Sequence, residues 1–419
     1  MSLLRFTRPK PETVFTPRKP LNEKMYVERR DLERRFDRAI RSTQHVAIFG
    51  DSGNGKTWLY QKVLKEKKCP YVLVDLSVAK TDGIDNAFRS ALSQPYGWQP
   101  DSKSSKNAGG AKAVLEVRKE EQTQYTFADE PPFEKLVNQV AKLSGNSKFI
   151  VFDNLESVAH VPEVLQALAG YVLRLDNPRF SAAQVRFLFV GVVSDVRNLL
   201  SGSAHVGTIA NRIQELPEVK RLSPFEAESV LRTGLLDELE IDFGEDEQDV
   251  LRGAMYYSGR NAQQLHEIGL NVAFEAEEND WCVGWGHASN AIIEWGHSSL
   301  AGYAPIVRSR LNKKDTRVQR RNQVLYCIAK GAPDEFSVSE IDNFVRNEFP
   351  HNANVVQLGI DQILKGLSVD EAPILFRDEN TNRYRFAHPK LRIAIRYVLK
   401  KSEDGDVVEN KDLARPHFD

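Results

Sequence analysis

The segment GDSGNGKT, from Gly50 to Thr57, is the feature that most constrains how this chain can fold. It fits the pattern G-x-x-x-x-G-K-[ST], and it lies between the apolar run HVAIF and the helical pattern WLYQKVLKEK. This strand, loop and helix setting is the context in which the pattern binds phosphate. Glycines let backbone N–H groups surround an anion, and the dipole of the following helix favours negative charge there. We therefore expect a phosphate-binding loop; the alternative is an ordinary glycine-rich turn.

The loop residues have distinct expected roles. Lys56 is predicted to reach the β- and γ-phosphates of a nucleotide, and the Thr57 hydroxyl is predicted to ligate Mg²⁺. The other phosphate-binding candidates are the remaining residues of the loop: Gly50, Asp51, Ser52, Gly53, Asn54 and Gly55. The motif thus predicts a nucleotide with its magnesium ion as the ligand.

A second motif, KFIVFDN, supplies a carboxylate that suits the same site. Its apolar residues indicate a buried strand, and they end at Asp153. The carboxyl end of a parallel strand lies at the edge of the sheet where the phosphate-binding loop also lies. We expect Asp153 to hold Mg²⁺ through water; the alternative is an aspartate that caps a helix or forms a turn.

The remaining apolar runs predict the fold class. YVLVDLS, over residues 71–77, and RFLFVGVV, over residues 186–193, are typical of buried strands, and amphipathic helical patterns separate the strands. Such alternation predicts an α/β fold with a parallel P-loop NTPase sheet that is covered on both faces. Three helical patterns followed by two short strands and a polar turn predict a winged helix near the C-terminus.

The length of 419 residues favours two to three domains. Near Ser223 the sequence SPFE has the residues of a helix N-terminus with a capping box, and it opens an all-helical region. The tryptophans of that region are expected to pack in its core. The predicted parts are an extended N-terminal arm (1–22), a P-loop ATPase core (23–216, with 95–132 inserted or irregular), a helical lid with linker helices (217–311), a winged-helix domain (312–401) and a disordered tail (402–419).

Composition excludes several function classes. The 57 Lys and Arg residues balance 58 Asp and Glu residues, so no global positive charge draws the chain to nucleic acid or an anionic membrane. No stretch of 18 apolar residues occurs, so we expect no membrane segment. Cys69, Cys282 and Cys327 have no metal-site spacing, which favours a reducing compartment. A cytoplasmic protein is expected.

The order of these motifs resembles the AAA+/STAND class of P-loop ATPases, in particular bacterial relatives of origin-recognition and signal-transduction ATPases, over residues 25–400. The resemblance implies ATP or ADP with Mg²⁺ as cofactors. AAA+ members usually have a glutamate directly after the strand aspartate to polarise the attacking water, whereas this chain has Asn154. Glu156 is the candidate for that role; slow hydrolysis or a nucleotide-bound switch is the alternative.

The resemblance also assigns residues around the nucleotide. Arg29 lies in a V-x-R-x-x-L match that borders the adenine site, and Ser194 ends the strand that resembles sensor 1. Arg212 in IANRIQEL is the candidate arginine finger, with a salt-bridged surface arginine as the alternative. Arg260 lies in the sensor-2 region, and His388 in FAHPKLR resembles a histidine that contacts ADP in STAND proteins, or is a structural histidine.

Two functions follow from the resemblance. The first is an ATP-dependent switch that self-assembles and controls a separate effector protein, in bacterial defence or stress signalling. The second is a DNA-binding loader or target-selection ATPase that grips the duplex through its winged helix. The basic residues of that region would form a local patch. However, the third helix, ANVVQLGIDQILKGL, which would enter a major groove, exposes mainly Gln357, Asp361, Gln362 and Lys365, and this face is almost neutral. A third alternative is a degenerate NTPase that serves as a scaffold.

Overall fold

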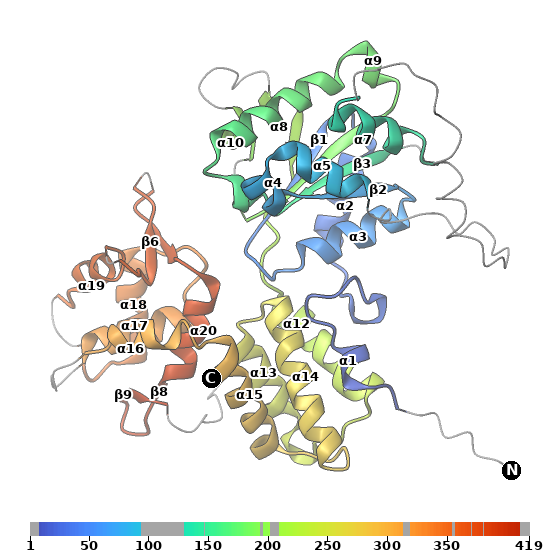
Figure 1. Cartoon of the computed structure of the whole chain (residues 1–419). Helices are drawn as coiled ribbons and strands as arrows, with labels where there is room; N and C mark the ends of the chain where they lie inside the picture. The colour runs from blue at the N-terminus through green and yellow to red at the C-terminus, as the bar shows by residue number, and fades with distance from the viewer. Residues whose placement is uncertain are drawn as a thin grey trace, which may run out of the picture. The chain divides into compact units, whose positions relative to one another are not determined.

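The computed structural model describes residues 8–93, 130–145, 147–192, 196–201, 209–312, 319–353, 357–369, 371–379 and 381–410 (Figure 1). It forms two compact units. The α/β unit comprises Glu28–Asp51 and Gly55–Lys220, and the helical unit comprises Met1–Val27, Ser52–Asn54 and Arg221–Asp419. The tip of the glycine-rich loop thus groups with the helical unit. Most of the predicted irregular segment 95–132, and Ser194, lie outside the described residues.

The α/β unit contains one five-stranded sheet in the order β2-β3-β4-β1-β5, and every neighbouring pair is parallel. This confirms the predicted parallel P-loop sheet. Each long strand is a continuous apolar run because parallel strands are buried on both faces. The strands are β1 (His45–Phe49), β2 (Tyr71–Asp75), β3 (Lys148–Asp153), β4 (Val185–Gly191) and β5 (Ile213–Glu215).

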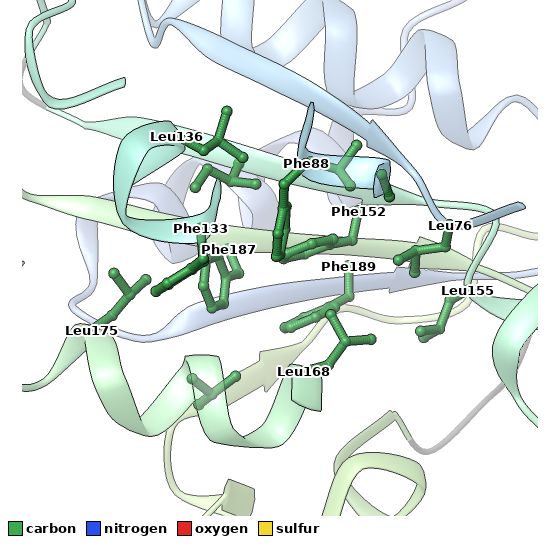
Figure 2. Close-up of a cluster of buried hydrophobic side chains, with 14 of the residues drawn as sticks. Leu76, Phe88, Phe133, Leu136, Phe152, Leu155, Leu168, Leu175, Phe187 and Phe189 are labelled. Atoms are coloured by element: carbon green, nitrogen blue, oxygen red, sulfur yellow. The ribbon is translucent and has the colours of Figure 1, made fainter. Parts of the chain in front are cut away.

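Helices cover both faces of this sheet. On one face the side chains of α2 and α3 pack together with those of the strands. On the other face α4, α5, α7 and α8 enclose an aromatic core in which Phe88, Phe152 and Phe187 are fully buried (Figure 2). The bounds are α2 (Arg30–Arg41), α3 (Lys56–Glu66), α4 (Leu76–Asp82), α5 (Ile84–Leu92), α7 (Pro132–Ala141), η2 (Leu155–Val158), α8 (Pro162–Leu175), α9 (Pro178–Ser181) and α10 (Val196–Ser201).

The first long helix of the helical unit begins after Ser223, as the capping-box sequence predicted. The Ser223 side chain accepts a hydrogen bond from the Glu226 N–H, and the Glu226 carboxylate accepts one from the Ser223 N–H. Trp285 and Trp295 are buried, as expected for core residues, whereas Trp281 is only half-buried. The bounds are α12 (Pro224–Leu231), the π-helix η3 (Arg232–Glu238), η4 (Gly244–Asp246), α13 (Glu247–Ser258), α14 (Ala262–Glu278), α15 (Trp285–Ser299) and α16 (Ala304–Ser309).

The N-terminal segment differs from the extended arm that we predicted. It contains a short helical turn, α1 (Pro11–Val14), and a second turn, η1 (Glu23–Met25), follows directly after the segment. Proline at the first position of a helix is tolerated because its missing N–H is not needed there. Phe15 is fully buried, and Cβ atoms added at Gly234 and Gly269 would lie 2.3 and 2.4 Å from its ring. The burial of Phe15 therefore contributes to holding the segment on the helical unit.

The C-terminal part has the predicted three helices and β-hairpin. The helices are α17 (Arg320–Lys330), α18 (Val338–Glu348) and α19 (Ile360–Gly366), and the hairpin is β6 (Leu375–Arg377) with β7 (Tyr384–Phe386). Phe336, between α17 and α18, forms a further bridge with Tyr384. The element order is the predicted one, and its identity as a winged helix stays a prediction.

The chain continues through α20 (Pro389–Val398) into a second antiparallel hairpin, β8 (Leu399–Lys401) with β9 (Val407–Glu409). The prediction of a disordered tail from residue 402 is therefore wrong for residues 402–410. Val407 is buried while its neighbour Val408 is exposed, and the surrounding charges conceal this short alternation in the sequence. In the part of the chain that the structure describes, no helix is long and apolar enough to cross a membrane.

Candidate phosphate-binding site

The glycine-rich loop has a backbone that its glycines make possible. Gly53 and Gly55 have φ values of +81° and +89°, a region that residues with a side chain rarely adopt. Gly50 has another constraint, since a Cβ there would lie 2.3 Å from the Val219 carbonyl oxygen. The pattern of glycines therefore reflects both the turn and a close approach of the chain.

Lys56 begins α3 and folds back over the loop. Its Nζ donates hydrogen bonds to the carbonyl oxygens of Gly50 and Asp51, over 2.8 and 3.0 Å. Burial lowers the pKa of Lys56, and the nearby charges of Glu156 and Asp153 oppose that shift. The structure thus brings together the lysine and the two carboxylates that the sequence singled out.

Asp153 ends β3 in a polar cluster at the edge of the sheet. Burial raises the pKa of its carboxyl group, against the hydrogen bond that its Oδ1 accepts from the Asn154 N–H over 2.9 Å. Asp75 ends β2 directly beside it in the strand register. Sequence analysis missed Asp75, although it ends its apolar run YVLVD as Asp153 ends KFIVFD.

Asn154 links the two aspartates at the ends of β2 and β3. Its backbone is left-handed, with a φ of +62°, and its side-chain amide donates to Asp75 Oδ1 over 2.9 Å. Asparagine adopts this backbone more readily than most residues. Asn154 therefore orders the acidic edge instead of contributing a carboxylate to it.

Glu156 lies in η2, and its Oε2 accepts a hydrogen bond from the Val192 N–H over 3.1 Å. This bond fixes the carboxylate at the end of β4. A Cβ on Gly191 would lie 2.8 Å from the Leu155 Cβ, so the close approach of the two segments depends on a glycine. The position of Glu156 is thus set by the backbone of the neighbouring strand.

The donor set fits a nucleotide-bound magnesium ion. Among the residues that the structure describes, no three His, Cys, Asp or Glu side chains form a metal cluster. Mg²⁺ at nucleotide sites is held by one or two carboxylates, with water and phosphate oxygens as its other ligands. The exposed Thr57 hydroxyl and the Asp153 carboxylate are suitable ligands of this kind.

Two of the candidate site residues in the α/β unit, Arg29 and Arg212, form contacts within that unit. Arg29 donates through Nη1 to the Lys220 carbonyl oxygen over 2.9 Å, and Lys220 follows Val219, which lies against Gly50. Arg212 forms an ion pair with Asp176. The salt-bridged alternative for Arg212 is therefore present in the structure, and its role as an arginine finger stays a prediction.

Arg260 lies in the tight turn between α13 and α14. It follows Gly259, and both residues are left-handed, each with a φ of +60°. Burial lowers the pKa of the Arg260 guanidinium, as does the neighbouring charge of Arg221. A half-buried arginine on strained backbone is unusual, because such backbone persists only where surrounding contacts impose it.

His388 caps the N-terminus of α20. Its Nδ1 accepts a hydrogen bond from the Lys390 N–H over 3.1 Å, and its Nε2 lies 3.2 Å from the Tyr303 hydroxyl. These contacts agree with the structural role that is the alternative to ADP binding for His388. A contact with ADP stays a prediction.

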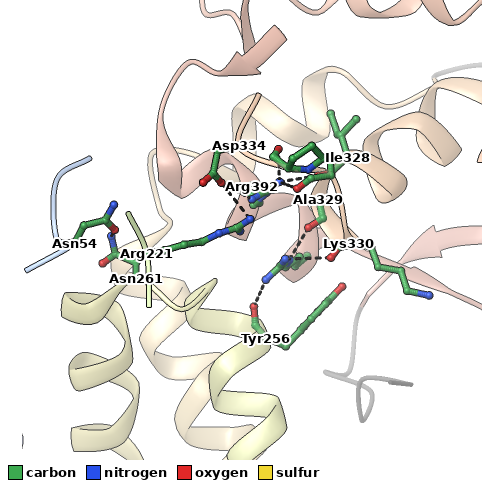
Figure 3. Close-up of polar contacts among 12 residues, drawn as sticks. Asn54, Arg221, Tyr256, Asn261, Ile328, Ala329, Lys330, Asp334 and Arg392 are labelled. Carbon is green, nitrogen blue, oxygen red and sulfur yellow. Dashed lines mark hydrogen bonds and ion pairs between the residues drawn. The ribbon is translucent and has the colours of Figure 1, made fainter. Parts of the chain in front are cut away.

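Two arginines of the expected basic patch are buried instead. Arg392 donates to the carbonyl oxygens of Ala332 and Pro333 and lies 3.3 Å from Asp334 (Figure 3). Arg396 donates to the carbonyl oxygens of Ala329 and Lys330. They stabilise the C-terminal end of α17 and do not add to an exposed basic surface.

The sequence matches no family model and no curated protein. Solved structures share its fold. The Walker-type ATPase PABY2304 of Pyrococcus abyssi is 14% identical and aligns over 91% of this chain and 99% of its own, with a TM-score of 0.52. The ORC2 protein of Aeropyrum pernix is 14% identical, with TM-scores of 0.51 in its ADP form and 0.52 in its ADPNP-ADP complexes. The latter alignment covers 91% of this chain and 96% of ORC2.

Proposed function

We propose that this chain is an ATP-binding and ATP-hydrolysing switch of the AAA+ type. The observation that carries the proposal is the convergence of Lys56, Asp153 and Glu156 beside the glycine-rich loop. The shared fold with a Walker-type ATPase, and with an ORC2 protein known in ADP and ADPNP complexes, supports it.

Each residue then has a chemical task. Lys56 exchanges its hydrogen bonds with the loop carbonyls for the β- and γ-phosphates. Thr57 and Asp153 hold Mg²⁺, which neutralises charge on the phosphates when it is bound. Glu156 orients the attacking water and takes its proton, and the Val192 N–H keeps its carboxylate in place.

Other residues complete the proposed site. Arg29 borders the adenine, Ser194 reads the γ-phosphate at the end of its strand, and Arg260 acts in the sensor-2 position. Arg212 leaves Asp176 and reaches the γ-phosphate of a neighbouring copy when the chain self-assembles. His388 contacts ADP in the resting state.

The output of the switch is a change of conformation that controls a separate partner protein. Differential contacts of ATP and ADP with the chain bias such an equilibrium. The resemblance to STAND ATPases extends this proposal to bacterial defence or stress signalling. The molecular mass of the chain in ADP and in ATP, measured by light scattering, tests the assembly step: equal masses would contradict it.

Nucleotide binding is tested by calorimetric titration of the whole chain with ATP and ADP in the presence of Mg²⁺. Binding by the wild type and its loss in Lys56→Ala are expected. Lys65→Ala is the matched control, because Lys65 is exposed on the same helix. No binding by the wild type would refute the proposal.

DNA binding through the winged helix is the second candidate. The β6–β7 hairpin carries Phe376, which is 51% exposed, and the Arg385 guanidinium stacks 5.0 Å from its ring. Such an aromatic and basic pair suits a nucleic-acid surface. However, Arg383 is paired with Glu340, and Lys365 of α19 with Asp361.

Salt dependence tests this second function. A DNA-binding ATPase should lose affinity for duplex DNA steeply between low and moderate salt, because phosphate contacts release counterions. Arg385→Ala should weaken the binding. No binding at low salt would exclude this candidate and leave the switch.

A further inference from the structure

We propose that Asn261 is a positioning residue for the phosphate-binding loop. The proposal rests on the proposed nucleotide binding, and it names a residue that no part of the sequence motif indicates. Asn261 lies more than 200 positions from the loop, yet it belongs to the same compact unit as Ser52–Asn54.

Three hydrogen bonds join Asn261 and Gln263 to the tip of the loop. Asn261 Nδ2 donates to the Ser52 carbonyl oxygen over 2.8 Å and to Asn54 Oδ1 over 3.0 Å. The Gln263 N–H donates to the Gly53 carbonyl oxygen over 2.9 Å. Asn54 and Asn261, which face each other in Figure 3, are only 3% and 5% exposed, and the hydrogen bond between their side chains is buried.

The bonds are compatible with phosphate binding because they use different groups. Asn261 and Gln263 engage the carbonyl oxygens of Ser52 and Gly53, whereas a phosphate is bound by loop N–H groups. Because a peptide group is planar, a hydrogen bond to the Ser52 or Gly53 carbonyl oxygen also fixes the orientation of the N–H group that follows it. The loop can therefore be ordered before nucleotide binds, which lowers the entropic cost of binding.

Asn261 is itself held firmly. Its Oδ1 accepts the Gln264 N–H as the N-cap of α14, and the Leu222 N–H donates to the Arg260 carbonyl oxygen beside it. At the start of the turn, Arg396 Nη1 donates to the Tyr256 carbonyl oxygen over 2.5 Å. These bonds explain why the left-handed turn at Gly259 and Arg260 persists.

The test uses Asn261→Ser, which removes the amide donor but keeps a side-chain oxygen that caps the helix. Asn177→Ser is the matched control, because Asn177 caps α9 through the Arg179 N–H. In the nucleotide-free full chain, we expect faster hydrogen exchange in the peptide that covers the loop for Asn261→Ser only. We also expect an ADP dissociation constant about fivefold to tenfold higher, as loss of a buried hydrogen bond implies.

The outcomes separate this proposal from the proposed function. If the wild type does not bind ADP, the proposed function fails, while the exchange measurement still tests whether Asn261 orders the loop. If the wild type binds ADP and Asn261→Ser has unchanged affinity and loop exchange, the positioning role is refuted. A general loss of thermal stability with unchanged loop exchange and affinity would assign Asn261 a structural role alone.

A double-mutant cycle adds a sharper measurement. Asn54→Ala and Asn261→Ser each break the same side-chain contact, so their effects on ADP affinity should be less than additive. Additive effects would show that the Asn54–Asn261 contact does not transmit the positioning.

Discussion

The side-chain amide of Asn154 donates a hydrogen bond to Asp75 Oδ1 over 2.9 Å and so joins the carboxyl ends of β3 and β2. AAA+ ATPases, which the sequence resembles, usually carry a glutamate at this position, whereas here its side chain joins two strand ends. Asp153, next to it, remains close to Lys56. The asparagine at this position therefore has a structural role in this chain.

Asn154→Glu restores that pattern but should not raise turnover. A glutamate there would face Asp75 with like charge, lose the amide hydrogen bond and carry left-handed backbone strain. These effects should destabilise the chain by about 1–3 kcal/mol. Denaturant unfolding measures the loss of stability, and an ATP hydrolysis assay measures turnover. Faster hydrolysis by Asn154→Glu would contradict this role of Asn154.

Glu156→Gln should reduce ATP hydrolysis by about 10²–10⁴-fold, the contribution typical of a general base. The glutamine side-chain oxygen can still accept from the Val192 N–H, so nucleotide affinity should stay the same. Single-turnover hydrolysis and ADP titration measure the two quantities. Unchanged hydrolysis would show that Glu156 does not activate water.

Phe15→Ala should destabilise the helical unit by about 3–5 kcal/mol, because it leaves a cavity in a fully buried site. Phe225→Ala is the control in the same unit, since Phe225 is 82% exposed, and it should change stability by less than about 0.5 kcal/mol. Denaturant midpoints compare the variants. Equal effects would mean that the N-terminal segment is not part of the unit's core.

Stability should fall as the pH drops below about 6.5, the usual pKa of histidine. Burial lowers the pKa of His45 to about 4, and its Nδ1 accepts the Phe187 N–H over 3.0 Å. Burial also lowers the pKa of His266 to about 4. Between pH 6.5 and 4 the unfolded chain binds these protons and the folded chain does not, so each histidine removes up to about 1.4 kcal/mol of stability per pH unit.

Denaturant unfolding at pH 7.5 and pH 5 tests this pH dependence. His45→Asn keeps an acceptor for the Phe187 N–H but has no proton to gain, so its stability should vary less with pH. His351→Asn replaces an exposed histidine and is the control. An unchanged pH dependence in His45→Asn would contradict the assignment.

The sheet and the loop could be predicted because their signals are local. Each buried parallel strand is a continuous apolar run, and the glycines mark the turn that follows β1. The position of Asp153 at the end of β3 could be predicted for the same reason. Asp75 ends its apolar run as Asp153 does, but its place beside Asp153 depends on the pairing of β2 with β3, which the sequence alone does not show.

Other features depend on contacts between distant segments. Nothing near Phe15 in the sequence shows that Gly234 and Gly269 make room for it. Asn261 has the residue type of an ordinary helix cap, and its contact with Ser52 appears only in the folded chain. Arg392 and Arg396 are the residue type expected on a basic surface, yet their side chains donate to carbonyl oxygens at the C-terminal end of α17.

The most direct test of the central claim is Mg²⁺-dependent ATP hydrolysis by the purified chain. The account predicts measurable phosphate release by the wild type, a loss of at least about 100-fold in Lys56→Ala, as removal of a charge-stabilising donor implies, and near-normal rates in the exposed-site control Lys65→Ala. Absence of hydrolysis in the wild type, or equal rates in wild type and Lys56→Ala, would contradict the proposal that this site hydrolyses ATP.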